Sequence, residues 1–131
     1  MRIEPATALR GDLAVPGDKS ISHRGLLLGA IAEGETPVEG FGASADTLAT
    51  AEALRALGAR VEVRGEGARV EGVGLRGLQV PEGPIDCGNA GTLLRLLPGI
   101  LAGQSGRFEL IGDESLSRRP LERIAEPLRE M

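Results

Sequence analysis

The chain has 131 residues, of which 41% are hydrophobic and 26% charged, and its formal net charge is −4 at pH 7. These values are typical of a globular chain. The chain has one cysteine and one histidine, which excludes an internal disulfide framework and an ordinary structural zinc site. An acidic chain with two phenylalanines and no tryptophan or tyrosine also lacks the basic surface and stacking side chains of nucleic-acid binders.

Segment 1–20 carries charged residues and prolines where a secretory signal needs an apolar run. No stretch reaches the roughly 18 apolar residues of a membrane span. We therefore expect a cytoplasmic protein with neither a membrane nor a nucleic acid as its partner. Lys19 is the only lysine beside fourteen arginines, and its compact ammonium offers a point charge that the planar guanidinium does not reproduce.

The first half of the chain predicts two helices and three strands. The expected elements are a helix at 20–32, a strand at 36–42, a helix at 45–57 and a hairpin of 60–64 with 68–73. The first helix begins at a possible Ser20 cap and is apolar on nearly every face, which indicates burial. The second is amphipathic and stops at Gly58.

The same order returns after about 70 residues. The expected elements are an apolar helix at 90–102, a strand at 106–112 and an amphipathic helix at 119–131. The matching positions are Arg24 with Arg95, Gly42 with Gly112, and Leu54-Arg55 with Leu128-Arg129. This self-similarity predicts stacked supersecondary units.

The second unit lacks its ending, because Met131 falls opposite Leu57, directly before the helix stop and the hairpin that close the first unit. We therefore expect the chain to be a piece of a longer protein. The alternative is a helix that happens to end the chain.

Lys19, Ser20 and Arg24 stand where a loop meets the first helix, with Arg24 one turn after Ser20 on the same face. Backbone N–H groups at a helix start, the helix dipole and two cations together favour a phosphate, which arginine can bind with two hydrogen bonds. The alternative is a helix start with both cations in water.

Segment 88–92 occupies the matching place in the second unit, with Arg95 one turn into its helix. Gly91 leaves the backbone open to close approach by a ligand, while Asn89 and Thr92 supply neutral hydrogen bonds. An N-cap turn without any ligand explains the same residues.

Two arginines, Arg118 and Arg119, stand before Pro120 at the start of the last expected helix. A helix N-terminus favours acids rather than cations, so this conflict points to an anionic ligand. The alternative is a solvated pair of charges on a surface turn.

Several other sequence features give weaker evidence for a functional site. Segment 72–77 has the spacing G-x-G-x-x-G, but the prolines and glycine of 81–84 follow it in place of the helix that a nucleotide fingerprint requires. We interpret His23 as a polar helix-face residue rather than a catalytic base, and Cys87 as an inert small side chain near the site. Asp46 belongs to the first turn of its helix, or lines the cleft.

Taken in order, segments 16–24, 88–92 and 118–120 resemble the motifs of the EPSP synthases, and the likeness spans almost the whole chain. The pattern Lys-Ser-x-Ser-x-Arg at 19–24 argues against the sister family that acts on UDP-N-acetylglucosamine. One departure is Leu96-Leu97 after Arg95, where many members have proline directly after the arginine. Pro98 should then kink the helix differently.

The resemblance implies an α+β fold in which two domains, built from repeated βαβαββ units, close on substrates between them. Residues 1–15 would be the first strands of the other domain, and 16–131 a partial substrate-binding domain. Unit one would span about 16–84 and unit two about 85–131, the second truncated.

The implied reaction transfers the enolpyruvyl group of phosphoenolpyruvate to the 5-hydroxyl of shikimate 3-phosphate and releases phosphate, a step of aromatic amino acid biosynthesis. By resemblance, Lys19, Ser20 and Arg24 bind shikimate 3-phosphate, and Lys19, Gly91 and Arg119 bind phosphoenolpyruvate. Asn89, Thr92 and Arg95 have supporting roles.

The resemblance also implies that neither cofactor nor metal is needed and that the full enzyme is a monomer. The family takes its catalytic acid and base from segments beyond residue 131, so we expect the chain alone to be inactive. Two alternatives are an enolpyruvyl transferase with another acceptor alcohol and a non-catalytic anion-binding domain.

Overall fold

The computed structural model describes residues 5, 8 and 10–131 and combines helices with strands, as an α+β chain does. The elements in order are α1 (Lys19–Ala30), β1 (Glu33–Glu39), α2 (Ala45–Ala56), β2 (Arg60–Arg64), β3 (Gly67–Val73), β4 (Ile85–Asp86), α3 (Gly91–Leu101), β5 (Leu110–Ile111), α4 (Glu114–Ser117) and α5 (Glu122–Glu130).

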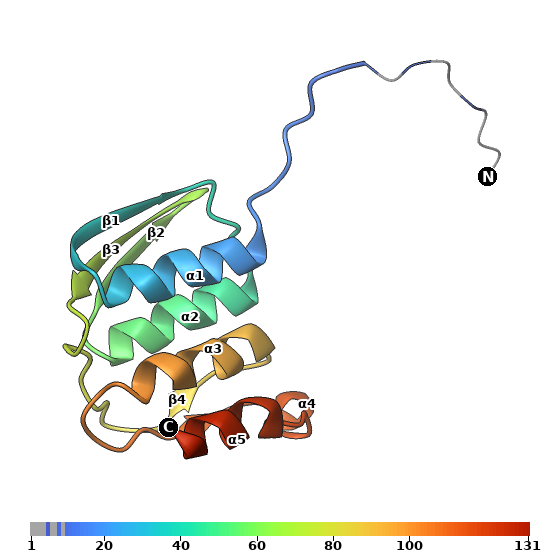
Figure 1. Cartoon of the computed structure of the whole chain (residues 1–131). Coiled ribbons are helices and arrows are strands. Elements are labelled where there is room, and N and C mark those ends of the chain that lie inside the picture. The colour runs from blue at the N-terminus through green and yellow to red at the C-terminus, as the bar shows by residue number, and fades with distance from the viewer. Residues whose placement is uncertain (1–4, 6–7, 9) are drawn as a thin grey trace.

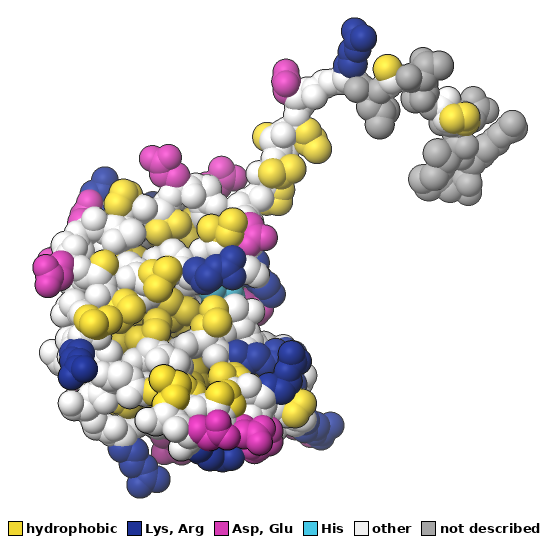
Figure 2. All heavy atoms as spheres, in the orientation of Figure 1, with side chains coloured by type: hydrophobic (Ala, Val, Ile, Leu, Met, Phe, Trp, Pro, Cys, Tyr) yellow, Lys and Arg dark blue, Asp and Glu magenta, His cyan; other side chains and the backbone are white. Residues whose placement is uncertain are grey.

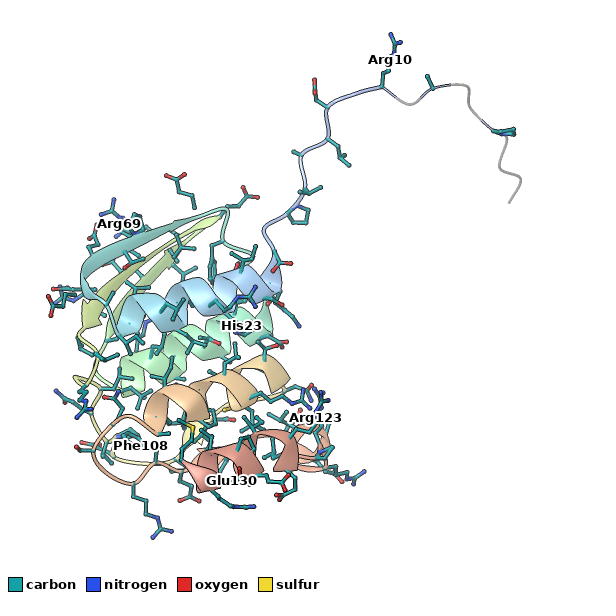
Figure 3. The ribbon with its side chains drawn as sticks, in the orientation of Figure 1. Arg10, His23, Arg69, Phe108, Arg123 and Glu130 are labelled. Atoms are coloured by element: carbon teal, nitrogen blue, oxygen red, sulfur yellow. The ribbon has the colours of Figure 1, made fainter. Side chains whose placement is uncertain are left out.

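The larger sheet has β3 between β1 and β2, antiparallel to both, and α1 and α2 cover one of its faces (Figure 1). The alternation of β2 and β3 explains this one-sided burial, because Val61 pairs with Val70 and both side chains are buried. Charged residues point the other way, where Arg69 pairs with Glu35 at 2.8 Å. Figure 3 shows Arg69 on this open side of the sheet.

The core lies between this sheet and the helices. Its large, fully buried side chains include Leu26 of α1, Leu54 of α2 and Phe41 of the loop between β1 and α2. Burial of one such side chain stabilises a fold by roughly 1.5–3 kcal/mol. The many apolar side chains of the first expected helix therefore pack in the core. Phe41 is buried in the same core and holds its loop against the helices.

The second half is smaller. β4 and β5 form a two-stranded parallel sheet, and α3 packs against α2, where Leu93 and Leu97 are fully buried. α4 and α5 follow at the far edge of the molecule (Figure 1), and α5 buries none of its residues fully.

The helices α1, α2 and α3 lie side by side and run in the same direction, so that their N-terminal ends meet at one edge of the molecule (Figure 1). Parallel helices bring three positive dipole ends to this edge. We call it the N-terminal edge. The candidates for anion binding that the sequence marks at 19–24 and 89–95 lie at the starts of α1 and α3, on this edge.

Ser20 is not the cap of the first helix, contrary to the sequence prediction. The helix begins at Lys19, and Asp18 Oδ1 accepts a hydrogen bond from the Ile21 N–H at 2.7 Å. Asp and Ser are about equal as caps, so the choice is set by where the loop turns. The hydroxyl of Ser20 is thereby left for another partner.

The hairpin and the first three helices are confirmed within a few residues, but the last third of the chain needs correction. Strand 106–112 shortens to Leu110–Ile111, and its partner β4 was not predicted. The helix predicted at 119–131 begins only at Glu122, because α4 and a turn at 118–121 come first.

The prediction that 1–15 contributes strands to another domain stays a prediction. Residues 1–4, 6–7 and 9 lie outside the described residues, and 10–15 are exposed and neither helical nor extended in a sheet. In the part of the chain that the structure describes, no helix could cross a membrane, and no three His, Cys, Asp or Glu side chains are grouped to hold a metal ion.

Candidate anion-binding site

Ser22 fixes the start of α1 against the loop that enters α2. Its hydroxyl donates to the Asp18 carbonyl at 2.8 Å and accepts from the Gly42 N–H at 2.9 Å. A Cβ on Gly17 would collide with the backbone of Gly40, and one on Gly42 with the backbone of Gly17. Two glycines are therefore required for the loops to touch, and this contact places the first residues of α1 beside the first residues of α2.

Lys19 and Asp46 meet across these two helix starts. The Lys19 Nζ lies 2.8 Å from Asp46 Oδ2, with the lysine side chain 52% exposed and the aspartate side chain 27% exposed. Asp46 is in the first turn of α2, as predicted, and it also lies at the N-terminal edge. An exposed pair of this kind is weak, so Lys19 can exchange Asp46 for a stronger anionic partner at little cost.

Arg24 is exposed one turn beyond Ser20. Neither side chain forms a hydrogen bond within the described part of the chain. The structure thus brings Lys19, Ser20 and Arg24 to the same end of α1, with two of the three polar groups uncommitted. Figure 2 shows Lys and Arg side chains along this edge.

His23 lies between α1 and α2 and is fully buried (Figure 3). Its Nδ1 is 2.6 Å from Thr50 Oγ1, and its Nε2 is buried without a hydrogen-bond partner among the described residues. Burial lowers the pKa of the imidazole, although Asp46 opposes this and Lys19 adds to it. A buried nitrogen cannot reach a substrate, which supports reading His23 as a helix-face residue and not as a base.

Gly91 begins α3, where Ala90 stands at the cap position and forms no side-chain cap bond. A Cβ on Gly91 would lie 2.8 Å from Arg119 Nη1 and 3.6 Å from Arg95 Nη1. Two guanidinium groups therefore converge on the space that the missing side chain leaves. Neither forms an ion pair with a carboxylate in the described residues.

Asn89 is not an N-cap. Its Oδ1 accepts a hydrogen bond from Arg119 Nη2 at 2.7 Å, and its Nδ2 donates to the carboxylate of Asp113. Thr92 is half-buried in the first turn of α3 and forms no side-chain hydrogen bond within the described residues. The second group thus unites Asn89, Gly91, Arg95 and Arg119, whereas Arg118 is turned away to pair with Glu114.

Sequence reasoning missed Asp113. An aspartate directly before an acidic residue is an N-cap signal, and Asp113 does cap α4 by accepting from the Leu116 N–H at 2.7 Å. Its second role, the contact with Asn89, joins segments 24 residues apart and has no local signal.

Cys87 is fully buried directly after β4. Burial, and to a lesser degree the neighbouring Asp86, raises the pKa of this thiol to about 11. The thiol is therefore neutral and inert at physiological pH, as the sequence indicated.

Two other features do not form sites. After the glycines of 72–77 the chain continues as a turn and loop up to β4, so no helix opens to receive a dinucleotide. A shallow hollow of about 540 Å³ on the open face of the larger sheet is lined largely by Glu and Arg side chains that already pair with one another. All of its charges except that of Glu39 are thus already partnered.

The sequence model of the EPSP synthase (3-phosphoshikimate 1-carboxyvinyltransferase) family matches residues 3–131. The chain belongs to the EPSP synthase family. It is 55% identical over 130 residues to the 3-phosphoshikimate 1-carboxyvinyltransferase of Alkalilimnicola ehrlichii, covering 98% of this chain and 29% of that protein. It is 52% identical over 131 residues to the protein of the same name from Lactiplantibacillus plantarum, covering 100% of this chain and 30% of the relative.

The fold agrees with that of a solved EPSP synthase from Acinetobacter baumannii. That structure superposes with a TM-score of 0.87 at 48% sequence identity, over 92% of this chain and 28% of the other. The chain therefore spans about 30% of the length of the curated EPSP synthases that it matches.

Proposed function

We propose that this chain is the N-terminal part of an EPSP synthase and supplies the phosphate- and carboxylate-binding half of its active site. The whole enzyme would transfer the enolpyruvyl group of phosphoenolpyruvate to the 5-hydroxyl of shikimate 3-phosphate and release phosphate. The observation that carries this proposal is the convergence of Arg95 and Arg119 on Gly91 without a carboxylate between them. Two like charges held close together favour an anion as the third partner.

Each cationic group fits one polyanionic substrate. Lys19, Ser20 and Arg24 at the start of α1 would bind the phosphate of shikimate 3-phosphate, where backbone N–H groups and the helix dipole add to the two cations. Gly91 and Arg119 would bind phosphoenolpyruvate together with Lys19, which shares the N-terminal edge. Asn89, Thr92 and Arg95 would support this second site.

The reaction adds the 5-hydroxyl to C2 of phosphoenolpyruvate, and phosphate then leaves from the tetrahedral intermediate. The described residues can orient both substrates and neutralise the charge that develops on the phosphate. The acids at the edge are already engaged within the chain: Asp18 caps α1, Asp46 pairs with Lys19, and Asp113 accepts hydrogen bonds from Asn89. We therefore assign the catalytic acid and base to other parts of the enzyme, and expect the chain alone to be inactive.

The fold supports a unit organisation for the whole enzyme, which belongs to the same proposal. Each half has a helix that enters from a small-residue loop and packs beside strands, followed by a glycine, Gly42 or Gly112, before the next helix. We assign 16–84 to a first βαβαββ unit, 85–131 to an incomplete second unit and 1–15 to the other domain.

The test is phosphate release from phosphoenolpyruvate by the longer protein that begins with this chain, with shikimate 3-phosphate or UDP-N-acetylglucosamine as acceptor. We expect activity with shikimate 3-phosphate only, and a loss of at least about a hundredfold in Lys19→Ala because a charge-assisted contact with substrate is removed. Arg69→Ala, on the open face of the sheet, is the control and should keep full activity.

The other outcomes decide between the alternatives. Release with UDP-N-acetylglucosamine alone would assign the chain to a transferase with a different acceptor. Binding of shikimate 3-phosphate without any release would favour a non-catalytic anion-binding protein.

A further inference from the structure

We propose that Asp113 is a positioning residue for Arg119, acting through the side-chain amide of Asn89. This inference rests on the proposed phosphoenolpyruvate site and deepens it, because it names the group that holds the arginine in place. Asp113 itself contacts neither Arg119 nor the space beside Gly91 by any hydrogen bond.

Three hydrogen bonds form a continuous chain from Asp113 to Arg119. The Asn89 Nδ2 donates to Asp113 Oδ1 at 2.9 Å and to Oδ2 at 2.7 Å. The Asn89 Oδ1 then accepts from Arg119 Nη2 at 2.7 Å. The other terminal nitrogen of the same guanidinium, Nη1, is the atom that lies over Gly91.

The carboxylate determines which way the amide of Asn89 faces. A carboxylate can only accept hydrogen bonds, so the NH₂ group of Asn89 must point to Asp113 and the carbonyl oxygen must point away from it. That oxygen is then fixed toward Arg119. A neutral residue at position 113 would permit the opposite orientation, in which two N–H groups face each other and Arg119 loses its partner.

Asp113 is itself held on both sides. Its Oδ1 caps α4 through the Leu116 N–H at 2.7 Å, and its backbone N–H donates to the Gly88 carbonyl at 2.9 Å. The hydrogen bond from Asn89, with the Leu116 N–H next in importance, lowers the pKa of the Asp113 carboxyl. The residue is therefore ionised at neutral pH.

This arrangement keeps the charge of Arg119 available for an anion. Glu114 binds the neighbouring Arg118 directly, which neutralises that guanidinium. Arg119 contacts the neutral amide oxygen of Asn89 instead and forms no ion pair with a carboxylate of the described residues, although its charge helps to lower the pKa of Asp113. An intervening amide thus separates the orienting carboxylate from the substrate's carboxylate or phosphate.

The test separates positioning from capping in the full-length enzyme. Asp113→Ser keeps a good N-cap but is too short to reach Asn89, whereas Asp113→Ala loses both. We expect both variants to raise the KM for phosphoenolpyruvate about tenfold, which corresponds to one lost hydrogen bond of this kind, and to leave the KM for shikimate 3-phosphate within about twofold. Only Asp113→Ala should also lower the Tm.

The control and a second variant sharpen the result. Glu114→Gln, the adjacent acid of α4, should change neither KM. In a double-mutant cycle, Asn89→Ala should add little to Asp113→Ser, because the two residues act in series. If Asp113→Ser does not fold, Asp113→Asn replaces it in the test. This variant keeps the size of the side chain and the cap, and it should raise the KM for phosphoenolpyruvate by a smaller factor.

An unchanged KM for phosphoenolpyruvate in Asp113→Ser, with only a lower Tm in Asp113→Ala, would overturn the inference and leave Asp113 as a cap, while the proposed function would stand. Additive effects in the cycle would also overturn it. If the unmodified enzyme releases no phosphate with the two substrates, the proposed function falls, and this inference falls with it.

Discussion

At the scale of single residues, Gly91 matters for what it lacks. Several glycines in this fold adopt a positive φ, but Gly91 is helical and leaves room beneath two guanidinium groups. A side chain there would compete with a ligand for the space between Arg95 and Arg119.

Gly91→Ala should therefore weaken phosphoenolpyruvate binding in the full-length enzyme. The new methyl group would lie 2.8 Å from Arg119 Nη1, closer than van der Waals contact, so the guanidinium must move. We expect the KM for phosphoenolpyruvate to rise by about tenfold or more, with that for shikimate 3-phosphate little changed. Gly99→Ala is the matched control, because it lies on the same helix and its Cβ meets nothing within 4 Å. Equal effects from both substitutions would refute the steric explanation.

At the scale of elements, the position of each helix start decides which side chains reach the N-terminal edge. α1 is set by its Asp18 cap and by the bridge from Ser22 to the next loop. α2 is set by a capping box in which Ser44 and Thr47 satisfy each other's backbone N–H groups. The Lys19–Asp46 contact follows from these two local structures.

Asp18→Ala should destabilise α1 by about 1 kcal/mol, because the Ile21 N–H loses its acceptor. Asp18→Asn should restore most of the loss, since asparagine caps as well as aspartate. Chemical denaturation measures both. A larger destabilisation from Ser20→Ala than from Asp18→Ala would show that Ser20 is the cap and that the helix starts two residues later than it does here.

His23 links α1 to α2 and makes their packing depend on pH. Because burial lowers the pKa of His23 in the folded chain, the unfolded chain binds the proton more readily below pH 6.5. The stability from neutral His23 is thus fully present above pH 6.5 and is lost as the pH falls through the lower folded pKa. We expect the free energy of unfolding to fall between pH 6.5 and 5 in the wild type, and less so in His23→Gln. Parallel curves for the two proteins would contradict this.

At the scale of the whole molecule, three helices with parallel dipoles meet a set of cations at one edge. The same three helices expose leucines on a neighbouring surface, with Leu28 61%, Leu48 42% and Leu96 37% exposed. Figure 2 shows hydrophobic side chains gathered over the face that α1, α2 and α3 present to the viewer. Contiguous apolar surface of this kind favours association.

We expect the 131-residue chain by itself to self-associate as its concentration rises, which sedimentation velocity would detect. Replacing Leu28, Leu48 and Leu96 together by serine should return it to a monomer. Leu75→Ser, in the turn after β3, removes a side chain that is 69% exposed but lies off the helices, and should not change the association. Monomeric behaviour of the unmodified chain at all concentrations would contradict the prediction.

Local pattern in the sequence predicts α1, α2, α3 and the β2–β3 hairpin, because apolar density, alternation and glycine stops are properties of neighbouring residues. The short strand β4 escapes it, and β5 is only two residues of the strand predicted at 106–112, since each of the two exists through its pairing with the other. The break between α4 and α5 also escapes, because Pro120 was read as opening a helix that begins only at Glu122.

The candidate site divides in the same way. Lys19, Gly91 and Arg119 are visible as residue types at helix starts. The contacts of Lys19 with Asp46 and of Asn89 with Asp113 are not visible, because they join residues 27 and 24 positions apart. Such contacts follow from the packing of the helices, which no local pattern encodes.

Cys87 can report local opening of the structure around β4. As the only thiol, buried next to β4 and two residues before Asn89, it can react with an alkylating reagent only after the structure around it has opened. The rate at which Cys87 is alkylated therefore measures how often the segment that carries Asn89 and Gly91 opens. A substrate that closes this segment should lower the alkylation rate of Cys87, whereas one that binds only at α1 should leave that rate unchanged.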